Sequence, residues 1–171
     1  MFKRWRSHVS TVLMVVGVWT AVHFWQTRDI AYTALPDASQ DWALKAPDTP
    51  ESLQAWAQQY PDRPTLVYVW ATWCTICKFQ APTVQGLMDQ GIPVVTVAMQ
   101  SGTEAAVLQH LGQNQHAWPT VNDPSGQLAT ALGARSVPTW LVVNNNGQVV
   151  SSAVGFTPSW TLRLRLWWAQ I

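Results

Sequence analysis

The sequence is poor in charged residues and in cysteine. Of its 171 residues 11% are charged, against about 25% in an average soluble domain. The 48% of hydrophobic residues excludes an intrinsically disordered chain. A formal net charge of +1 and the lack of any long basic run exclude a dedicated nucleic-acid binder. Two cysteines are too few for the disulfide framework of a small secreted domain. The length fits one globular domain.

An uncharged, largely apolar stretch lies at residues 7–26, after the basic residues Lys3, Arg4 and Arg6. As a helix, with a rise of about 1.5 Å per residue, it would be about 28–30 Å long, close to the hydrocarbon thickness of a bilayer. We therefore expect an uncleaved signal anchor, a single transmembrane helix. Because the basic residues precede it, the N-terminus is expected in the cytoplasm. A cleaved signal peptide or a buried core helix are the alternatives.

The patterning predicts three segments: a cytoplasmic tip with the signal anchor at residues 1–28, a linker at 29–47, and a globular domain at 48–171. In the domain, uninterrupted β-branched and apolar runs predict buried strands, and 3.6-residue spacing predicts helices. The resulting class is α/β, with a mixed sheet and helices on both faces. Strands are expected at residues 65–70, 92–99, 140–143 and 148–154, and helices from Thr49-Pro50, from Cys74, at 104–114, at 128–132 and from Thr157-Pro158.

The chemistry is concentrated in a Cys-x-x-Cys motif between the first strand and the next helix. Cysteines three apart in a first helical turn have Cα atoms about 5–5.5 Å apart, which a disulfide accepts. The helix N-terminus favours a thiolate at Cys74, which we assign as the nucleophile, and Cys77 is the resolving thiol. Thr75 and Ile76 between them carry no charge.

Two other interpretations of the motif are an inert disulfide and half of a zinc site. Zinc would need two more ligands, and the only histidines of the domain, His110 and His116, are interpreted as surface residues. Lys78 stands where c-type haem attachment requires histidine, which excludes that cofactor. We expect no metal and no cofactor.

The chain resembles the thioredoxin superfamily, and in particular its membrane-tethered TlpA/ResA-like and ScsD-like branch. The resemblance rests on Val69-Trp70-Ala71-Thr72-Trp73-Cys74-x-x-Cys77, on Ala81-Pro82 beyond it, and on Ser136-Val137-Pro138-Thr139. It implies a three-layer thioredoxin-like fold with a mixed central sheet and a cis-proline loop, at Pro138, that faces the cysteines. It also implies that Trp73 and Val137 contribute to the docking of partner proteins.

The sequence departs from this family at the positions that move protons. The tethered reductases carry a glutamate three residues after the second cysteine, where this chain has Gln80. Plain thioredoxins bury an aspartate six residues before the first cysteine, where this chain has Tyr68. Thr75-Ile76 lacks the proline that many relatives carry between the cysteines. We therefore expect Thr75, Ile76, Lys78 and Gln80 to modulate the redox pair, with a solvated helix charge as the alternative interpretation of Lys78.

The functional prediction is a membrane-anchored thiol–disulfide oxidoreductase that exchanges disulfides with protein partners, as a reductant. It would lie on the bacterial inner membrane with the redox domain in the periplasm, and a membrane partner would relay electrons to it. The alternative is a non-enzymatic module that binds copper or another soft metal, or is chaperone-like. Five tryptophans are interpreted as packing residues, with the last two alternatively resting on the membrane: Trp118, Trp140, Trp160, Trp167 and Trp168.

Overall fold

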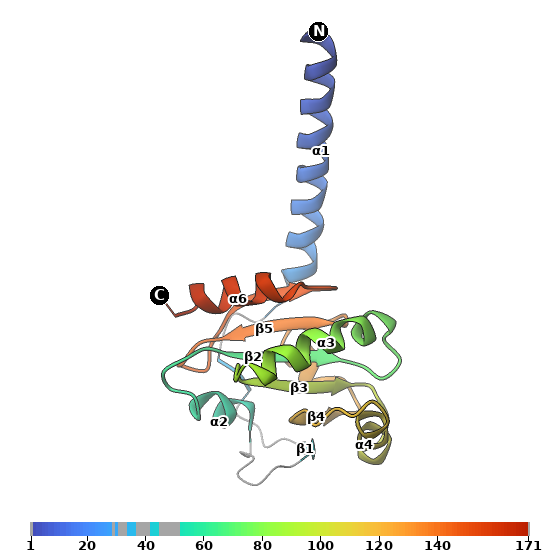
Figure 1. The fold of residues 1–171 in the computed structure, drawn as a ribbon, viewed down its shortest axis with the longest axis vertical. Coiled ribbons are helices and arrows are strands. Elements are labelled where there is room, and N and C mark those ends of the chain that lie inside the picture. The colour runs from blue at the N-terminus through green and yellow to red at the C-terminus, as the bar shows by residue number, and fades with distance from the viewer. Residues whose placement is uncertain (1, 29, 31–33, 37–41, 45–51, 171) are drawn as a thin grey trace.

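A six-stranded mixed sheet forms the centre of the computed structural model, which describes residues 2–28, 30, 34–36, 42–44 and 52–170 (Figure 1). The strand order is β1-β4-β3-β2-β5-β6. Strands β2, β3 and β4 run parallel, whereas β1 is antiparallel to β4, and β5 is antiparallel to both β2 and β6. The bounds are β1 Trp42–Leu44, β2 Thr65–Trp70, β3 Val94–Met99, β4 Thr120–Asp123, β5 Thr139–Val143 and β6 Val149–Val154.

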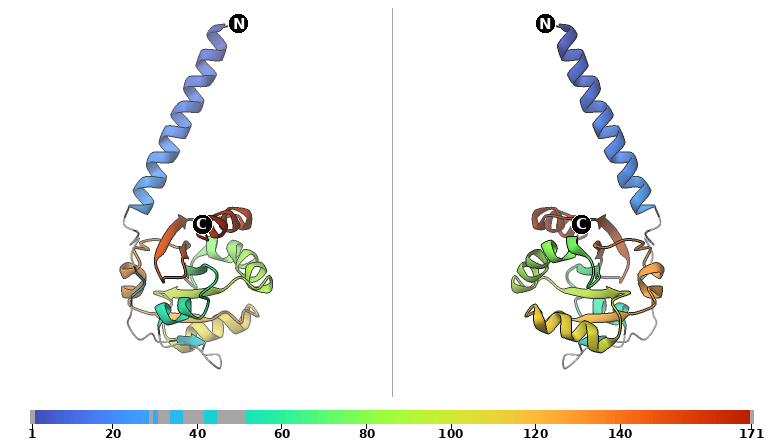
Figure 2. Two further views of the ribbon diagram at one scale, coloured as in Figure 1. Left: turned by 90° about the vertical axis from the view of Figure 1, so that its left-hand side faces the viewer. Right: turned by 90° about the vertical axis from the view of Figure 1, so that its right-hand side faces the viewer.

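Helices cover both faces of this sheet, which gives three layers (Figures 1 and 2). Alternate residues of β2 point to opposite faces, so that Leu66, Tyr68 and Trp70 lie in one apolar cluster and Val67 and Val69 in the other. The first cluster packs against α3, α4 and α6, and the second against α2 and α5. The helices span α2 Leu53–Gln58, α3 Thr75–Asp89, α4 Glu104–Gln113, α5 Gln127–Ala131 and α6 Ser159–Trp168.

Most of the predicted elements of the domain are present, and the expected α/β class, with a mixed sheet and helices on both faces, is confirmed. The predicted start of the first domain helix at Thr49-Pro50 lies outside the described residues; the described helix α2 begins at Leu53, and Ser52 Oγ caps it by accepting a hydrogen bond from the Ala55 amide at 3.1 Å. Two short strands, β1 and β4, were not predicted. Strand β1 lies in the segment expected to be a linker, so part of that segment belongs to the sheet.

Helix α1 (Phe2–Thr27) extends away from the domain (Figures 1 and 2). Its described side chains are exposed, including Leu13 and Met14 at 67% and 71%. In the described part of the chain, no helix meets the length and hydropathy needed to cross a bilayer, so the expected transmembrane span is not confirmed. After α1, the chain is fixed to the turn before β6, because the Leu35 amide donates to the Gly147 carbonyl at 2.9 Å.

Candidate active site

The two cysteines lie at the start of α3, shortly after the end of β2. Strand β2 ends at Trp70, and Cys74 is the N-cap residue of α3, with extended backbone angles. Cys74 and Cys77 form a disulfide whose Cα atoms are 5.2 Å apart, within the range expected from a first helical turn. The two residues are 6% and 5% exposed. The pair therefore belongs to the edge of the core rather than to a loose surface loop.

The sulfur of Cys74 lies at the positive end of the α3 dipole. Its Sγ accepts a hydrogen bond from the Cys77 amide at 3.1 Å, which is the position of an N-capping side chain. Unpaired amide groups and the helix dipole at this end stabilise negative charge. A thiolate at the position of Cys74 would gain this stabilisation, whereas Cys77 lies one turn inside the helix.

The loop that carries Trp73 is held in place by the loop after β3. The Thr72 amide donates to Ser101 Oγ at 3.0 Å, and the Trp73 indole Nε1 donates to the Gln100 carbonyl at 3.0 Å. Gln100 adopts a φ of 47°, in the left-handed region, which helps to turn its carbonyl toward the indole. Trp73 is nevertheless 61% exposed, so its ring forms a fixed apolar surface beside Cys74.

The Val137–Pro138 loop lies at the same end of the sheet as the cysteines. In the antiparallel register of β2 and β5, Val69 pairs with Thr139, so that Pro138 is next to the end of β2. The Val137–Pro138 peptide bond is cis, and the Pro138 carbonyl accepts a hydrogen bond from the Gly155 amide at 2.8 Å. Val137 is half-buried and packs against the apolar cluster that contains both cysteines. The fold thus brings the two sequence motifs together.

The remaining predicted residues divide into exposed and buried ones. Thr75, Ile76 and Lys78 are exposed on the first turn of α3, and Ile76 extends the apolar surface of the site. Gln80 is fully buried and makes two hydrogen bonds to one backbone residue. Its Nε2 donates to the Thr157 carbonyl, and its Oε1 accepts from the Thr157 amide, both at 2.8 Å. Gln80 therefore joins α3 to the chain just before α6.

A family model described as Redoxin matches residues 30–161. The chain belongs to the Redoxin family. It is 38% identical over 99 residues to a thioredoxin-like protein of Haemophilus influenzae, which covers 58% of this chain and 59% of that protein. It is 29% identical over 83 residues to the thiol-disulfide oxidoreductase ResA of Oceanobacillus iheyensis, covering 46% of this chain and 43% of ResA. The chain thus spans about half the length of these curated relatives.

The solved structures agree with the Redoxin assignment at the level of the fold. The pneumococcal exposed lipoprotein thioredoxin Etrx1 of Streptococcus pneumoniae superposes with a TM-score of 0.58 at 24% identity. The match covers 64% of this chain and 87% of that one. Together with the Redoxin match and the thioredoxin-like relative, this fold confirms the resemblance to the thioredoxin superfamily inferred from the cysteine and proline motifs.

A cavity of about 500 Å³ opens behind Cys77 in this Redoxin-family domain. Tyr68, at the position where plain thioredoxins carry aspartate, lines it, and burial raises the pKa of its phenol well above the ordinary value. Its Oη is buried and has no hydrogen-bond partner among the described residues. No Asp or Glu lines the described part of this cavity. Within the described part of this cavity, therefore, no carboxylate can accept a proton directly from Cys77.

The two histidines of the domain line the same cavity, which the sequence did not indicate. The expectation that they are surface residues is wrong in part, since both are half-buried against tryptophans. His116 stacks on Trp118 with ring centroids 4.1 Å apart, and His110 lies 5.5 Å from the Trp70 ring. Burial lowers the pKa of both imidazoles, and for His110 the charge of Lys78 lowers it further.

No cluster of three or more His, Cys, Asp or Glu side chains suited to a metal ion occurs among the residues described.

The five tryptophans that the sequence predicts to be packing residues differ in their burial. Trp118 and Trp140 are buried, as packing residues should be. Trp160, Trp167 and Trp168 are 67%, 57% and 71% exposed, so the packing interpretation is wrong for these three. Their shared helix, α6, lies on the outside of the domain (Figure 1).

Proposed function

We propose that this Redoxin-family chain is a thiol–disulfide oxidoreductase that exchanges disulfides with protein partners. The observation that carries the proposal is the Cys74–Cys77 disulfide at the N-terminus of α3, with the Cys74 sulfur in the capping position. A redox pair needs one stabilised thiolate and one thiol within reach of it, and the first turn of a helix supplies both.

The exchange proceeds in two steps from the reduced protein. The Cys74 thiolate attacks one sulfur of a partner disulfide, the partner's S–S bond breaks, and a mixed disulfide forms while the other partner sulfur leaves as a thiolate. Cys77 then loses its proton and attacks the Cys74 sulfur, which releases the second partner sulfur. The partner gains two electrons and the Cys74–Cys77 disulfide forms. The reverse sequence oxidises a partner dithiol.

We assign partner docking to the surface around Cys74. Trp73 and Ile76 offer exposed apolar area beside the sulfur. Val137 makes no backbone hydrogen bond within the described part of the chain, so its amide and carbonyl can pair with an extended partner segment. Partners would therefore bind through one strand-like segment that carries the target disulfide.

The favoured direction is reduction of partners. Strong oxidants of this kind owe their potential to extra stabilisation of the thiolate, and Thr75 and Ile76 add no charge to it. Only the helix terminus and the exposed Lys78 favour the anion, so we expect a potential more reducing than about −180 mV. A domain of this potential needs a membrane partner that supplies electrons.

The proposed location is the outer side of the bacterial inner membrane. Helix α1 supports this proposal by its apolar, exposed middle and by Lys3, Arg4 and Arg6 at its start, which favour a cytoplasmic N-terminus. The membrane-tethered branch that the chain resembles has the same order of helix and domain. A carbonate wash tests the attachment, because recovery of the protein in the soluble fraction would contradict it.

Insulin reduction with dithiothreitol as electron source tests the activity. The wild-type protein should accelerate precipitation of the insulin B chain, and Cys74→Ser should abolish the acceleration. Cys77→Ala is the matched variant at the resolving position and should retain only single-step exchange. If the wild-type protein binds copper(I) tightly but does not accelerate the reaction, the chain is a soft-metal-binding module instead.

A further inference from the structure

The outer side of α6 is apolar, although it faces away from the domain. Leu162 and Leu166 are buried against the sheet. On the opposite side, residues spaced by four form one exposed stripe, with Trp160 at 67%, Leu164 at 50% and Trp168 at 71% exposure. A solvent-facing side of a helix normally carries charged and polar residues. Such a stripe is typical of a surface that another molecule covers.

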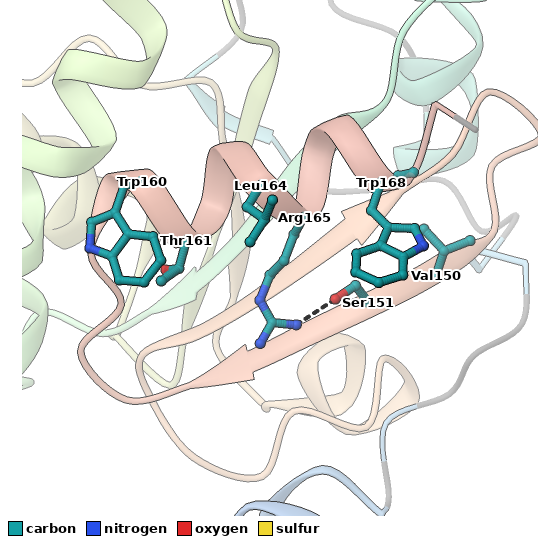
Figure 3. A pocket seen from close by; sticks show the side chains of 8 residues that line it. Val150, Ser151, Trp160, Thr161, Leu164, Arg165 and Trp168 are labelled. Atoms are coloured by element: carbon teal, nitrogen blue, oxygen red, sulfur yellow. Dashed lines mark hydrogen bonds between the residues drawn. The ribbon is translucent and has the colours of Figure 1, made fainter.

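A groove of about 540 Å³ continues the stripe onto the edge strand β6 (Figure 3). Val150 and Ser151 of β6 form its floor together with the α6 stripe. Arg165 bridges the groove, because its Nη1 donates to Ser151 Oγ at 2.6 Å. Arg163 is exposed on the other flank of the stripe, away from the groove, beside Leu166 and Trp167. We call the stripe, the groove and Arg163 the α6 face.

The charge of the α6 face has one sign. No acidic residue follows Asp123 in the whole sequence, whereas Arg163 and Arg165 lie on α6. Tryptophan and arginine together are the residues that bind the headgroup region of a bilayer, where indole rings and cations meet ester groups and anionic phosphates. A partner protein with an apolar patch would account for the tryptophans but not for the lack of acids.

The position of α1 on the domain determines which side of the domain lies nearest to the anchor. Helix α1 contacts β6, and the chain after it is fixed there by the bond from the Leu35 amide to the Gly147 carbonyl. Figures 1 and 2 show α1 leaving the domain on the side where α6 and β6 lie. The part of the domain nearest to the anchor thus includes α6 with its exposed tryptophans.

We propose that the α6 face lies on the headgroup layer of an anionic bilayer and fixes the orientation of the redox domain. This inference rests on the proposed attachment of α1 to the membrane and adds a second contact to it. Trp160, Leu164 and Trp168 enter the interface, and Arg163 pairs with lipid phosphates. Cys74 and Trp73 lie on other elements and stay accessible to partner proteins in the aqueous phase.

A single-site fluorophore on the full chain tests the proposal. In a Cys74→Ser/Cys77→Ser chain, Leu164→Cys is labelled with a polarity-sensitive dye, and Leu108→Cys, which replaces the exposed leucine of α4, is the matched control. Both proteins are reconstituted in vesicles of phosphatidylcholine and phosphatidylglycerol and floated on a density gradient. We expect the dye at position 164 to shift to shorter wavelength and to be quenched by headgroup-level nitroxide lipids, and the dye at 108 to do neither.

The outcomes separate the two membrane contacts. If the chains float but the dye at 164 behaves like that at 108, α1 attaches the protein and the docking of the α6 face is wrong. A blue shift at 164 that occurs without vesicles and is insensitive to nitroxide lipids shows that a second copy covers the face, which also overturns the proposal. If the chains do not float, both membrane contacts are refuted, whereas the insulin assay still decides the redox function.

Discussion

Replacement of Gln80 by leucine should destabilise the domain far more than a surface substitution does. Gln80 is fully buried, and both ends of its amide are paired with the backbone of Thr157, 77 residues away. Leucine has nearly the same size but no polar atoms. The substitution therefore leaves the amide and the carbonyl of Thr157, a residue only 6% exposed, without their partners.

The magnitude follows from the two groups that lose their bonds. A buried polar group left unsatisfied costs about 1–3 kcal/mol, so two such groups cost about 2–6 kcal/mol. The apolar surface of leucine recovers about 1 kcal/mol of this by burial. We expect the free energy of unfolding to fall by about 1–5 kcal/mol, a large share of the roughly 5–15 kcal/mol of a typical domain.

Urea denaturation of the oxidised protein, followed by circular dichroism, measures this difference. Gln109→Leu, on the exposed side of α4, is the matched control and should change the free energy by less than about 0.5 kcal/mol. A Gln80→Leu variant as stable as the control would refute the role of Gln80 as the tie between α3 and the chain before α6.

The Gln80→Glu substitution should make the stability of the domain depend on pH in a direction that the hydrogen bonds of this site predict. Only a protonated carboxyl can donate to the Thr157 carbonyl while it accepts from the Thr157 amide. Burial and this bond raise the pKa of the introduced glutamate in the folded protein above the ordinary value of about 4.3. Relative to the wild type, the variant should thus be most stable below about pH 4.3 and lose stability as the pH rises. A difference in the free energy of unfolding between Gln80→Glu and the wild type that does not change with pH would contradict this account.

Further predictions concern the cavity behind Cys77. Tyr68→Phe removes a buried hydroxyl that has no partner among the described residues, so the free energy of unfolding should stay equal or rise; a loss above about 1 kcal/mol in urea denaturation would show that the hydroxyl is satisfied. Burial and the Lys78 charge lower the pKa of His110 in the folded state, so the unfolded chain takes up the proton first. Stability should therefore fall as the pH drops below about 6.5, and less so in His110→Gln; equal slopes in the two proteins would contradict the shift.

The sequence was sufficient for the parts of the fold that are set locally. The run of residues 65–70 has the uninterrupted hydrophobicity of a strand buried on both faces, and β2 has these bounds. Strand β4 was missed because its four residues, Thr120–Asp123, include three polar ones. Their burial depends on distant partners, such as the Thr96 hydroxyl at 2.8 Å from that of Thr120. Strand β1 likewise exists only through its pairing with β4.

The candidate active site likewise has parts that local sequence predicts and parts that depend on tertiary packing. The Cys-x-x-Cys geometry follows from the helical turn itself, so the spacing of Cys74 and Cys77 was predictable. The place of Gln80 in the family motif predicts that it modulates the redox pair, and this stays a prediction; the two hydrogen bonds of its amide to Thr157 are set by the tertiary fold and could not be predicted. The cavity shared by Cys77 and His110 arises where β2, α3 and α4 pack together, and no sequence pattern marks it.

Trapping of mixed disulfides tests the central claim most directly. In cells that produce Cys77→Ser, the Cys74 thiolate should attack partner disulfides and remain bound, because no second thiol resolves the bond. Non-reducing gels should then show higher-mass complexes that disappear with reductant, and Cys74→Ser should show none. If Cys74→Ser traps partners and Cys77→Ser does not, the nucleophile is Cys77 and the mechanism proposed from the N-terminus of α3 is wrong.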